Sequence, residues 1–407
     1  MTDPLVVVGG VYEERCLHPS WQQYYGSGGR AASAIAKMGA QVKLYTRLDP
    51  AGRQELEERA ALENFTFHAE HMEDPVRFEY HHPLETPRIE GAYPKQSSLH
   101  VEAEAVVQFG MIEGDAVVKA DRVVYDPQNA EETQHFVANG SQARELALIL
   151  NRREARQLSG MTVSATADEM AKKLLQDTGA RVVVIKEGPL GAYVLADKTD
   201  MRIPAYRSRK VWKIGSGDNF VAHFGYQWLV QREPAAKCVE LAARATAYYC
   251  QAQEFVSPSI LAKFKPEEIN VKESIIKGRH QPNIYLAGPF FTLNQLWMVK
   301  QARADLRGLG LEVFSPVHDV GHGTAEEVVE PDLEAIKAAD VVFAIVDGMD
   351  PGTVYEIGYA KALNKPVVVY SENETDDNLT MMVGSGCIIR NDYATAIYET
   401  VWEAVRK

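Results

Sequence analysis

Acidic residues in the last third of the chain have the types and spacing to act on a sugar. Asp350 and Glu356 follow an apolar run at residues 341–346, which has the pattern of a buried strand. Asp332 precedes that run, and Tyr285 lies in an earlier apolar run. Because ligands of doubly wound sheets bind where the strands end, we expect these four side chains to face one crevice.

This group of side chains suits cleavage of an N-glycosidic bond. The reaction passes through an oxocarbenium-like state, which a nearby carboxylate can stabilise or capture covalently. A second acidic group handles the proton on the departing base, and crowding pushes the pKa values of neighbouring carboxyls apart. A tyrosine hydroxyl can hold the nucleophile ionised and oriented. The residues therefore predict an N-glycosidase or glycosyltransferase site.

Each of these residues also has a purely structural interpretation. Thr353 and Glu356 have the spacing of a helix capping box, in which the glutamate satisfies backbone donors. Asp350 could be a turn residue before Pro351, and Tyr285 could be an ordinary core tyrosine. Spacing alone leaves both interpretations of Glu356 open.

The same region carries several short motifs in sequence. They are IYLAGPFF at residues 284–291, Ser315-Pro316, DGMDPGTVYEIGYA at residues 347–360, Lys365-Pro366 and Asn378-Leu379. Together they resemble the nucleoside 2-deoxyribosyltransferase family over nearly the whole of residues 281–407. The resemblance implies a flavodoxin-like domain that acts on nucleosides.

That resemblance implies a role for each acidic group. Glu356 would be the nucleophile that takes the 2-deoxyribosyl group, and Tyr285 would orient it. Asp332 and Asp350 would hold the sugar and base edges and assist proton transfer. Asn378 resembles a residue that a neighbouring subunit lends to the 5′ end of the sugar, which implies a homo-oligomer. The substrate-binding residues would be Gly288, Phe290, Gly352 and Asn378.

Nucleoside-monophosphate N-hydrolases share the glutamate but carry a phosphate loop rich in Gly, Ser and Arg after the first strand. This chain has Pro289, Phe290 and Phe291 at that place. A nucleoside is therefore favoured over a nucleotide as the substrate.

A second constellation lies in the first two thirds of the chain. Gly215, Ser216 and Gly217 open a helical segment, and successive backbone N–H groups at a helix N-terminus bind anions. Asp218, directly after them, could take a proton from an attacking hydroxyl. A Gly-rich helix start with an acidic first turn also occurs for structural reasons alone.

Further motifs accompany this one. They are Gly28-Gly29-Arg30-Ala31-Ala32, Asn151 with Glu154, Lys186-Glu187-Gly188 and Gly191. The set resembles the ribokinase-like (PfkB-type) family of sugar and nucleoside kinases, with Mg²⁺ and ATP as implied cofactors. By that resemblance Asp218 is the catalytic base. The phosphate-binding residues would be Gly215, Ser216, Gly217, Asn151, Glu154, Lys186 and Gly188.

Three positions depart from the kinase pattern. Trp212-Lys213 replaces the common Asp-Thr before the anion hole, and Ser33 replaces an asparagine that touches the sugar. The early substrate-binding aspartate is missing, and Glu13 and Glu14 are the nearest carboxylates. The fold is expected to survive these changes, whereas a non-catalytic, ligand-binding role for this domain stays open.

The apolar patterns alternate between short strands and helices, which predicts parallel sheets covered on both faces. We expect a ribokinase-like three-layer α/β/α domain at residues 1–265, with a small β lid near residues 65–107. A linker at residues 266–280 and a flavodoxin-like doubly wound domain at residues 281–407 follow. Helices are expected near residues 131–137, 218–231, 327–339 and 353–363, among others.

Charge and composition exclude several classes of function. The net charge is −13. Residues 281–407 hold nine Lys and Arg against 19 Asp and Glu, or −10, which leaves −3 for residues 1–280. An acidic chain without basic stripes does not suit a nucleic-acid partner. No apolar run is long enough to cross a bilayer, and four scattered cysteines favour a reduced, cytoplasmic setting. His318, Asp319 and His322 are read as a loop lining the pocket, not as a direct metal site.

The sequence therefore predicts a bifunctional enzyme of nucleoside metabolism. The C-terminal domain would cleave or transfer the N-glycosidic bond of (2-deoxy)nucleosides through a glycosyl intermediate on Glu356. The N-terminal domain would be an ATP-dependent kinase of a sugar or nucleoside. The alternatives are a nucleoside 5′-monophosphate N-hydrolase coupled to a nucleoside kinase, or a glycosidase regulated by a non-catalytic, nucleotide-binding kinase-like domain.

Overall fold

The computed structural model describes residues 3–91, 96–128 and 133–407. The chain divides into two compact units. The first, here called the N-terminal domain, comprises Met1–Ser208 and Trp212–Glu268. The second, here called the C-terminal domain, comprises Arg209–Val211 and Ile269–Lys407. The boundary lies within the segment whose composition predicts a connection.

The N-terminal domain is built on a nine-stranded sheet in the order β13-β12-β11-β10-β9-β8-β1-β4-β5. All neighbours are parallel except β12 and β13, which are antiparallel additions at one edge. The strands are β1 (Leu5–Val8), β4 (Val42–Leu48), β5 (Thr66–His71), β8 (Leu99–Phe109), β9 (Ala116–Asp126), β10 (Gln142–Asn151), β11 (Val182–Lys186), β12 (Ala192–Ala196) and β13 (Thr199–Ile203).

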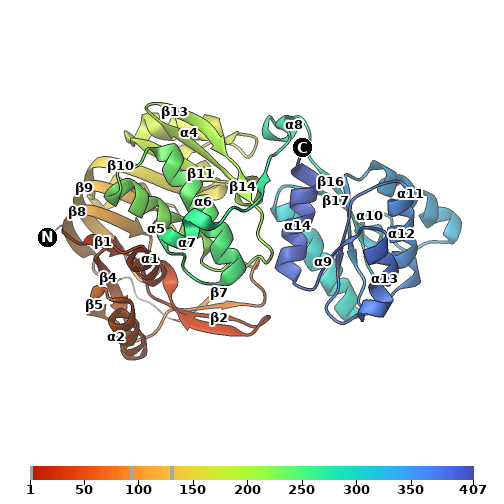
Figure 1. Ribbon diagram of the computed structural model, residues 1–407, viewed down its shortest axis with the longest axis horizontal. Coiled ribbons are helices and arrows are strands. Elements are labelled where there is room, and N and C mark those ends of the chain that lie inside the picture. Colours follow the sequence, from red (N-terminus) through yellow and green to blue (C-terminus); the bar gives the residue numbers. More distant parts are fainter. Residues whose placement is uncertain (1–2, 92–95, 129–132) are drawn as a thin grey trace. The chain divides into compact units, whose positions relative to one another are not determined.

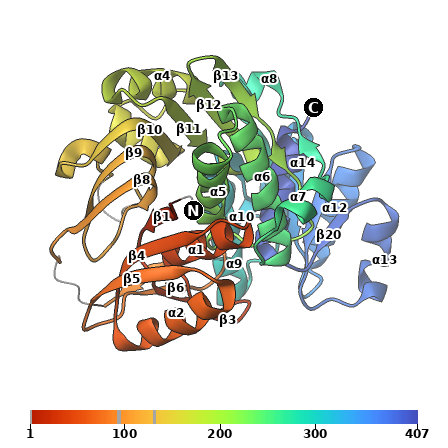
Figure 2. The same ribbon diagram turned by 60° about the vertical axis from the view of Figure 1, so that its left-hand side comes forward.

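Helices cover both faces of this sheet, as the runs of buried apolar residues predict. Successive strand residues face opposite sides, so Val7 and Val107 pack in one core while Val6 and Val106 pack in the other. Figures 1 and 2 show the resulting layers. The helices are α1 (Gly26–Lys37), α2 (Pro50–Glu63), α3 (Arg152–Ser159), α4 (Ala167–Thr178), α5 (Ser216–Gly225), α6 (Ala235–Ala252) and α7 (Pro258–Lys263).

A separate four-stranded sheet, in the order β3-β2-β6-β7, takes the place of the expected lid. Its strands are β2 (Glu13–Cys16), β3 (Trp21–Tyr24), β6 (Arg77–Tyr80) and β7 (Arg88–Glu90). The lid range of 65–107 is therefore too wide and omits β2 and β3. Strands β5 and β8 belong to the main sheet. Strand β5 pairs in parallel with β4, and the apolar end of β8 is buried where it pairs with β1. Residues 92–95 lie outside the described structure.

Two expected helices differ from the structure. Residues 133–135 precede a short 3-10 turn (η1, Phe136–Asn139), so the helix near residues 131–137 is wrong over its described part. Residues 131 and 132 lie outside the described residues. The helix that begins at Ser216 changes to a π-helical segment (η3, Tyr226–Val230) after α5.

The C-terminal domain contains a five-stranded, wholly parallel sheet in the order β17-β16-β18-β19-β20. The first strand of this domain along the chain, β16, is therefore second in the sheet, and the next strand, β17, lies at the edge beside it. This is the flavodoxin-like doubly wound order, which confirms the expected fold class. The strands are β16 (Asn283–Ala287), β17 (Glu312–Phe314), β18 (Val341–Ile345), β19 (Val367–Tyr370) and β20 (Ile388–Arg390).

Helices again cover both faces of this sheet (Figure 1). Helices α9 and α14 lie on one face, and α11, α12 and α13 lie on the other with Tyr285 and Val342 beneath them. The helices are α8 (Glu273–Ile276), α9 (Leu293–Gly308), α10 (Pro316–Asp319), α11 (Ala325–Ala338), α12 (Pro351–Ala362), α13 (Asp376–Gly384) and α14 (Tyr393–Val405). Within the described part of the chain, no helix has the length and apolar character needed to cross a membrane.

Candidate active sites

The C-terminal domain brings Tyr285 and Glu356 into direct contact. Tyr285 stands on β16, on the sheet face that α11 and α12 cover, and its side chain is fully buried. Its hydroxyl donates a hydrogen bond of 2.6 Å to Oε1 of Glu356. Glu356 faces the sheet because it lies on the side of α12 that also carries the buried Ile357 and Ala360. The tyrosine therefore orients one oxygen of this carboxylate.

Glu356 does not cap its own helix. Helix α12 begins at Pro351, and its N-cap is Asp350, whose side chain accepts from the backbone N–H of Thr353 at 2.8 Å. The capping-box interpretation of Glu356 is therefore wrong, while the structural interpretation of Asp350 is confirmed. The early start of the helix also moves Glu356 into its second turn, where the side chain points to the sheet.

Asp332 approaches from the middle of α11, directly after Pro331, which lies inside the same helix. Asp332 is half-buried, and its buried Oδ1 has no hydrogen-bond partner among the described residues. Burial raises its pKa to about 6. With a pKa of about 6, a fraction of Asp332 side chains carries a proton just below neutral pH and can donate it.

Burial also raises the pKa of Glu356, to about 7. The negative charges of Asp332 and Asp350 add to the increase, and the hydrogen bond from Tyr285 opposes it. The same environment raises the pKa of Tyr285 far above its usual value, so the phenol keeps its proton. The four side chains named from the sequence thus form one electrostatically coupled group.

The predicted substrate-binding residues lie in loops of this domain. Phe290 stacks on Phe291, with ring centroids 4.9 Å apart, and its ring meets the edge of His322 at 5.9 Å. Gly352 is exposed in the first turn of α12. Gly288 follows β16 and is half-buried.

Asn378 is exposed, on the first turn of α13. Its amide donates to Glu374 at 2.7 Å, and Glu374 also accepts from the backbone of Gly348. Within the described chain Asn378 thus belongs to a surface loop after β19, and its role toward a sugar stays a prediction.

The side chains of the histidine-bearing loop contact separate partners. His318 bonds Ser315 at 3.1 Å, whereas His322 packs on Phe290. Asp319 accepts from the backbone of Ser315 and pairs with Arg303. No group of three or more potential ligand residues was found among the described residues.

The glycine-bearing segment at residues 215–217 lies at the start of α5 in the N-terminal domain, where an anion hole is predicted. Gly215, with φ of +73°, is the N-cap, and the N–H groups of Ser216 and Gly217 open the helix. A side chain at position 217 would meet only the Nζ of Lys186, 3.9 Å away. The helix N-terminus and Lys186 therefore lie close enough to act on one anion.

Lys186 pairs with Asp126, a buried carboxylate that the sequence did not single out. The Nζ–Oδ2 distance is 2.7 Å. Burial raises the pKa of Asp126 to about 7; Lys186 opposes this, and the charges of Glu154 and Asp218 add to it. Asp126 ends strand β9, directly after the predicted strand at residues 122–125, so its place at a strand end was a usable signal.

Asn151 and Glu154 make a capping box at the start of α3. The Asn151 side chain accepts from the Glu154 backbone at 2.9 Å, and Glu154 accepts from Asn151 in return. Gly188 opens a 3-10 turn (η2, Gly188–Leu190) with φ of +57°, a conformation that favours glycine. These three residues therefore have structural roles, and their contact with phosphates or Mg²⁺ stays a prediction.

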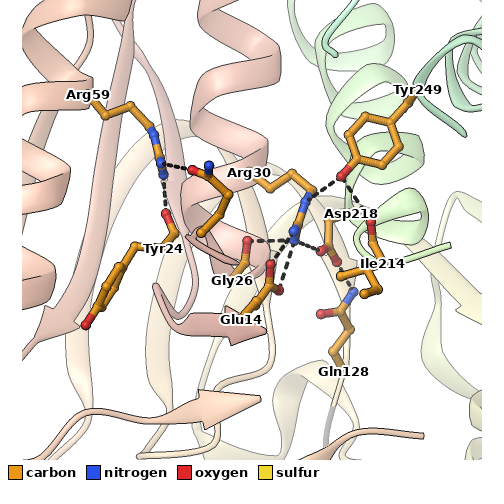
Figure 3. Close-up of polar contacts among 10 residues, drawn as sticks. Glu14, Tyr24, Gly26, Arg30, Arg59, Gln128, Ile214, Asp218 and Tyr249 are labelled. Carbon is orange, nitrogen blue, oxygen red and sulfur yellow. Dashed lines mark hydrogen bonds and ion pairs between the residues drawn. The ribbon is translucent and has the colours of Figure 1, made fainter. Parts of the chain in front are cut away.

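Asp218 is buried in the first turn of α5, and both of its oxygens are engaged. Oδ2 accepts from Arg30 at 2.8 Å, and Oδ1 accepts from Gln128 at 2.5 Å. Arg30 also pairs with Glu14 (Figure 3). Neither Arg30 nor Gln128 was assigned to the site from sequence, because residues far apart in the chain meet here only after folding.

Comparison with known proteins decides the type of each domain. Residues 284–390 match the sequence model of the family described as nucleoside 2-deoxyribosyltransferase, and residues 113–263 match that of the pfkB family carbohydrate kinases. The chain is a fusion of these two kinds of domain. The pair is the domain composition of a bifunctional enzyme of nucleoside metabolism.

Individual relatives are more distant. An uncharacterized protein of Ureaplasma parvum serovar 3 is 32% identical over 98 residues, which cover 21% of this chain and 62% of that protein. A ribokinase of Thermotoga maritima is similar in structure at 16% identity, over 64% of this chain and 98% of that one, with a TM-score of 0.49. Phosphofructokinase-2 of Escherichia coli is similar at 13% identity, over 64% and 98%, with a TM-score of 0.47.

The two family matches cover the site residues unequally. The deoxyribosyltransferase match includes all four residues of the group around Glu356. The kinase match includes the anion hole and Asp218 but begins at residue 113, so Glu14 and Arg30 lie outside it.

Proposed function

We propose that the C-terminal domain cleaves or transfers the N-glycosidic bond of (2-deoxy)nucleosides through a glycosyl ester on Glu356. The observation that supports this most is the 2.6 Å hydrogen bond from Tyr285 to Glu356, in a group that also includes Asp332 and Asp350. A buried carboxylate oriented by a tyrosine, with further carboxyls close to it, is the pairing of nucleophile and acid that glycosyl transfer requires.

The reaction would proceed in two displacements. In the first, an oxygen of Glu356 forms a bond to the anomeric carbon, the bond from that carbon to the base nitrogen breaks, and the base leaves with the bonding electrons. Asp332 or Asp350 supplies a proton to the base. In the second, a nitrogen of another base, or water, attacks the same carbon, the ester bond to Glu356 breaks, and the proton returns to the carboxylate.

Glu356→Gln tests this proposal. We expect base release from a panel of ribo- and 2-deoxyribonucleosides to fall to background, as measured by chromatography, because an amide cannot form the glycosyl ester. A 2-fluoro nucleoside, which slows both steps by destabilising the oxocarbenium-like state, should leave a sugar mass on a wild-type peptide containing Glu356. Undiminished base release by the variant would contradict the mechanism.

A stability measurement separates lost chemistry from lost folding. Because the pKa of Glu356 is raised above its unfolded value, to about 7, ionisation weakens the folded state as the pH rises from about 4.5 through 7. Glutamine removes that charge. The variant is therefore expected to melt at the same temperature as wild type, or higher, at pH 8.

For the N-terminal domain we propose ATP-dependent phosphorylation of a sugar or nucleoside, with Asp218 as the base. The N–H groups of Gly215, Ser216 and Gly217 would hold the transferring phosphoryl group, with Lys186 beside them. Bound Mg²⁺ would neutralise charge on the ATP phosphates. The buried Oδ1 of Asp126, next to Lys186, has no hydrogen-bond partner among the residues that the structure describes, and it is a polar group that fits such a ligand.

A second candidate for this domain is nucleotide binding without turnover, which would regulate the C-terminal domain. The engagement of both Asp218 oxygens by Arg30 and Gln128 favours it. ATP consumption with ribose, 2-deoxyribose and nucleosides, in wild type and Asp218→Asn, distinguishes the two. Turnover that the variant loses identifies a kinase.

We further propose that the enzyme is a cytoplasmic homo-oligomer acting on small molecules. The exposed position of Asn378 is compatible with a contact to a neighbouring subunit's substrate, and Met381, on the same helix, is a large exposed apolar side chain. Sedimentation of the full chain measures the subunit count.

A further inference from the structure

Arg30 is the most completely enclosed charged side chain around Asp218. It is 0% exposed, and it contacts carboxylates on both sides (Figure 3). One nitrogen donates to Asp218 at 2.8 Å, and the guanidinium also pairs with Glu14. Its Nε donates to the hydroxyl of Tyr249 at 3.2 Å. Every nitrogen of the guanidinium thus has a partner within the protein.

This guanidinium lies directly against the turn that forms the anion hole. A Cβ built on Gly215 would lie 1.9 Å from the Nε of Arg30, so the arginine fills the space beside the backbone of that glycine. A hydroxyl that attacks a phosphoryl group must lie beside both Asp218 and the start of α5. Arg30 occupies the approach to both.

Glu14 makes the arrangement specific to this chain. It stands on β2, in the small sheet, close to where the kinase pattern has its early substrate-binding aspartate. Burial raises its pKa, and Arg30 opposes that increase. The two carboxylates that would hold an acceptor from opposite sides therefore hold an arginine instead.

We infer that Arg30 is an internal occupant of the acceptor subsite, bridging Glu14 and Asp218 where a substrate's hydroxyl groups would lie. This inference rests on the proposed phosphotransfer function of the N-terminal domain and names the residue that controls it. A neutral sugar displaces Arg30 only at a cost, because the exchange would leave the buried cation without its carboxylate partners and replace two ion pairs by hydrogen bonds from neutral hydroxyl groups. The site opens only when Arg30 moves away.

The residue range of the kinase family match agrees with a division of the site into a phosphate-binding part and an acceptor part. The match begins at residue 113 and contains the phosphate-binding residues at α5, whereas Glu14 and Arg30 precede it.

The test measures acceptor binding apart from catalysis, in the full chain. Ribose and 2-deoxyribose are titrated calorimetrically, with a non-hydrolysable ATP analogue and Mg²⁺, into wild type, Arg30→Met, and Arg30→Met combined with Glu14→Gln. The cluster of Glu14, Arg30 and Asp218 has a net charge of −1 both in wild type and in the double variant. We therefore expect the double variant to fold even if the single variant does not. Circular dichroism checks that each variant is folded.

Arg59→Met is the matched control. Arg59 lies nearby over the ring of Tyr25, at 3.9 Å, and donates to Gln23, but it is not among the hydrogen-bond partners of Asp218 (Figure 3). The Arg59→Met substitution removes a cation from the same region but does not empty the space beside Gly215.

We expect wild type and Arg59→Met to bind the sugars at least about tenfold more weakly than a folded Arg30 variant. Equal binding in wild type, or no gain in the folded double variant, overturns the inference. Asp218-dependent phosphotransfer is read in parallel. Gained binding without any phosphotransfer would refute the kinase proposal and leave the role of Arg30 standing.

Discussion

At the scale of single residues, the function of Glu356 depends on its state of ionisation. A nucleophilic carboxylate must be charged, yet burial and the neighbouring carboxylates raise its pKa to about 7. The hydrogen bond from Tyr285 favours the charged form and works against that increase. Tyr285 is therefore expected to tune the pH range of the reaction as well as the direction of attack.

For wild type, kcat/KM for nucleoside cleavage should rise with pH through about 7, where Glu356 loses its proton in the free enzyme. Tyr285→Phe removes a bond that lowers this pKa, so the acidic limb should move to higher pH. The loss of activity should then be larger at pH 6 than at pH 9. The measurement is the pH profile of kcat/KM.

Tyr359→Phe, the same chemical change on the outer part of α12, is the control. Its ring stacks on Tyr355 and not on the acidic group. An acidic limb that stays in place in Tyr285→Phe, or one that moves equally in the control, would contradict the role given to Tyr285.

At the scale of elements, α12 carries Glu356, and Asp350 is the N-cap of this helix. As N-cap, Asp350 accepts from both the backbone and the hydroxyl of Thr353, at 2.8 and 3.0 Å. The cap fixes where the helix begins, and the start of the helix decides that Glu356 faces the sheet. Asp350 therefore affects the nucleophile through helix geometry as well as through its charge.

Asp350→Ala should lower the free energy of unfolding of the C-terminal domain by about 1 kcal/mol, the usual cost of a lost N-cap. It should also reduce base release, because α12 loses its fixed start. Denaturant unfolding and nucleoside cleavage measure the two effects.

Asp49→Ala is the matched control, since Asp49 caps α2 in the N-terminal domain by accepting from Ala51 and Gly52. A similar loss of stability with unchanged base release is expected there. If Asp350→Ala keeps full activity, the link from the cap to the nucleophile is wrong.

At the scale of the whole molecule, the charge is divided unequally. The C-terminal part, residues 281–407, has a net charge of −10 from nine basic and 19 acidic residues, against −3 for the rest. A 5′-monophosphate adds about two negative charges to a nucleoside near neutral pH. The field of this domain therefore opposes a nucleotide and does not affect a neutral nucleoside.

Nucleosides should accordingly be cleaved with a kcat/KM about tenfold or more above that of their 5′-monophosphates at low salt. Added salt should raise the value for the nucleotide by screening, and leave that for the nucleoside unchanged. Base-release rates at two ionic strengths measure both. A nucleotide that is preferred at every salt concentration would favour the alternative N-hydrolase function.

The sequence by itself determined both fold classes and the composition of the group around Glu356. Alternating strands and helices with buried apolar runs permit few architectures, and the strand order of the C-terminal sheet agrees with the one expected. Tyr285 lies in β16, and Asp350 and Glu356 follow the neighbouring parallel strand β18, so the sheet brings these residues to one edge. Local patterns therefore predicted which side chains gather there.

Only the tertiary structure decided where each side chain points and which groups it contacts. Spacing could not separate capping from catalysis at Glu356; the start of α12 at Pro351 and the bond from Tyr285 settled the direction of its side chain. Likewise Arg30, which also pairs with Glu14, reaches Asp218 only when the chain folds back, at a separation of 188 residues. Ion pairs between distant segments leave no periodicity or motif, because burial and geometry create them.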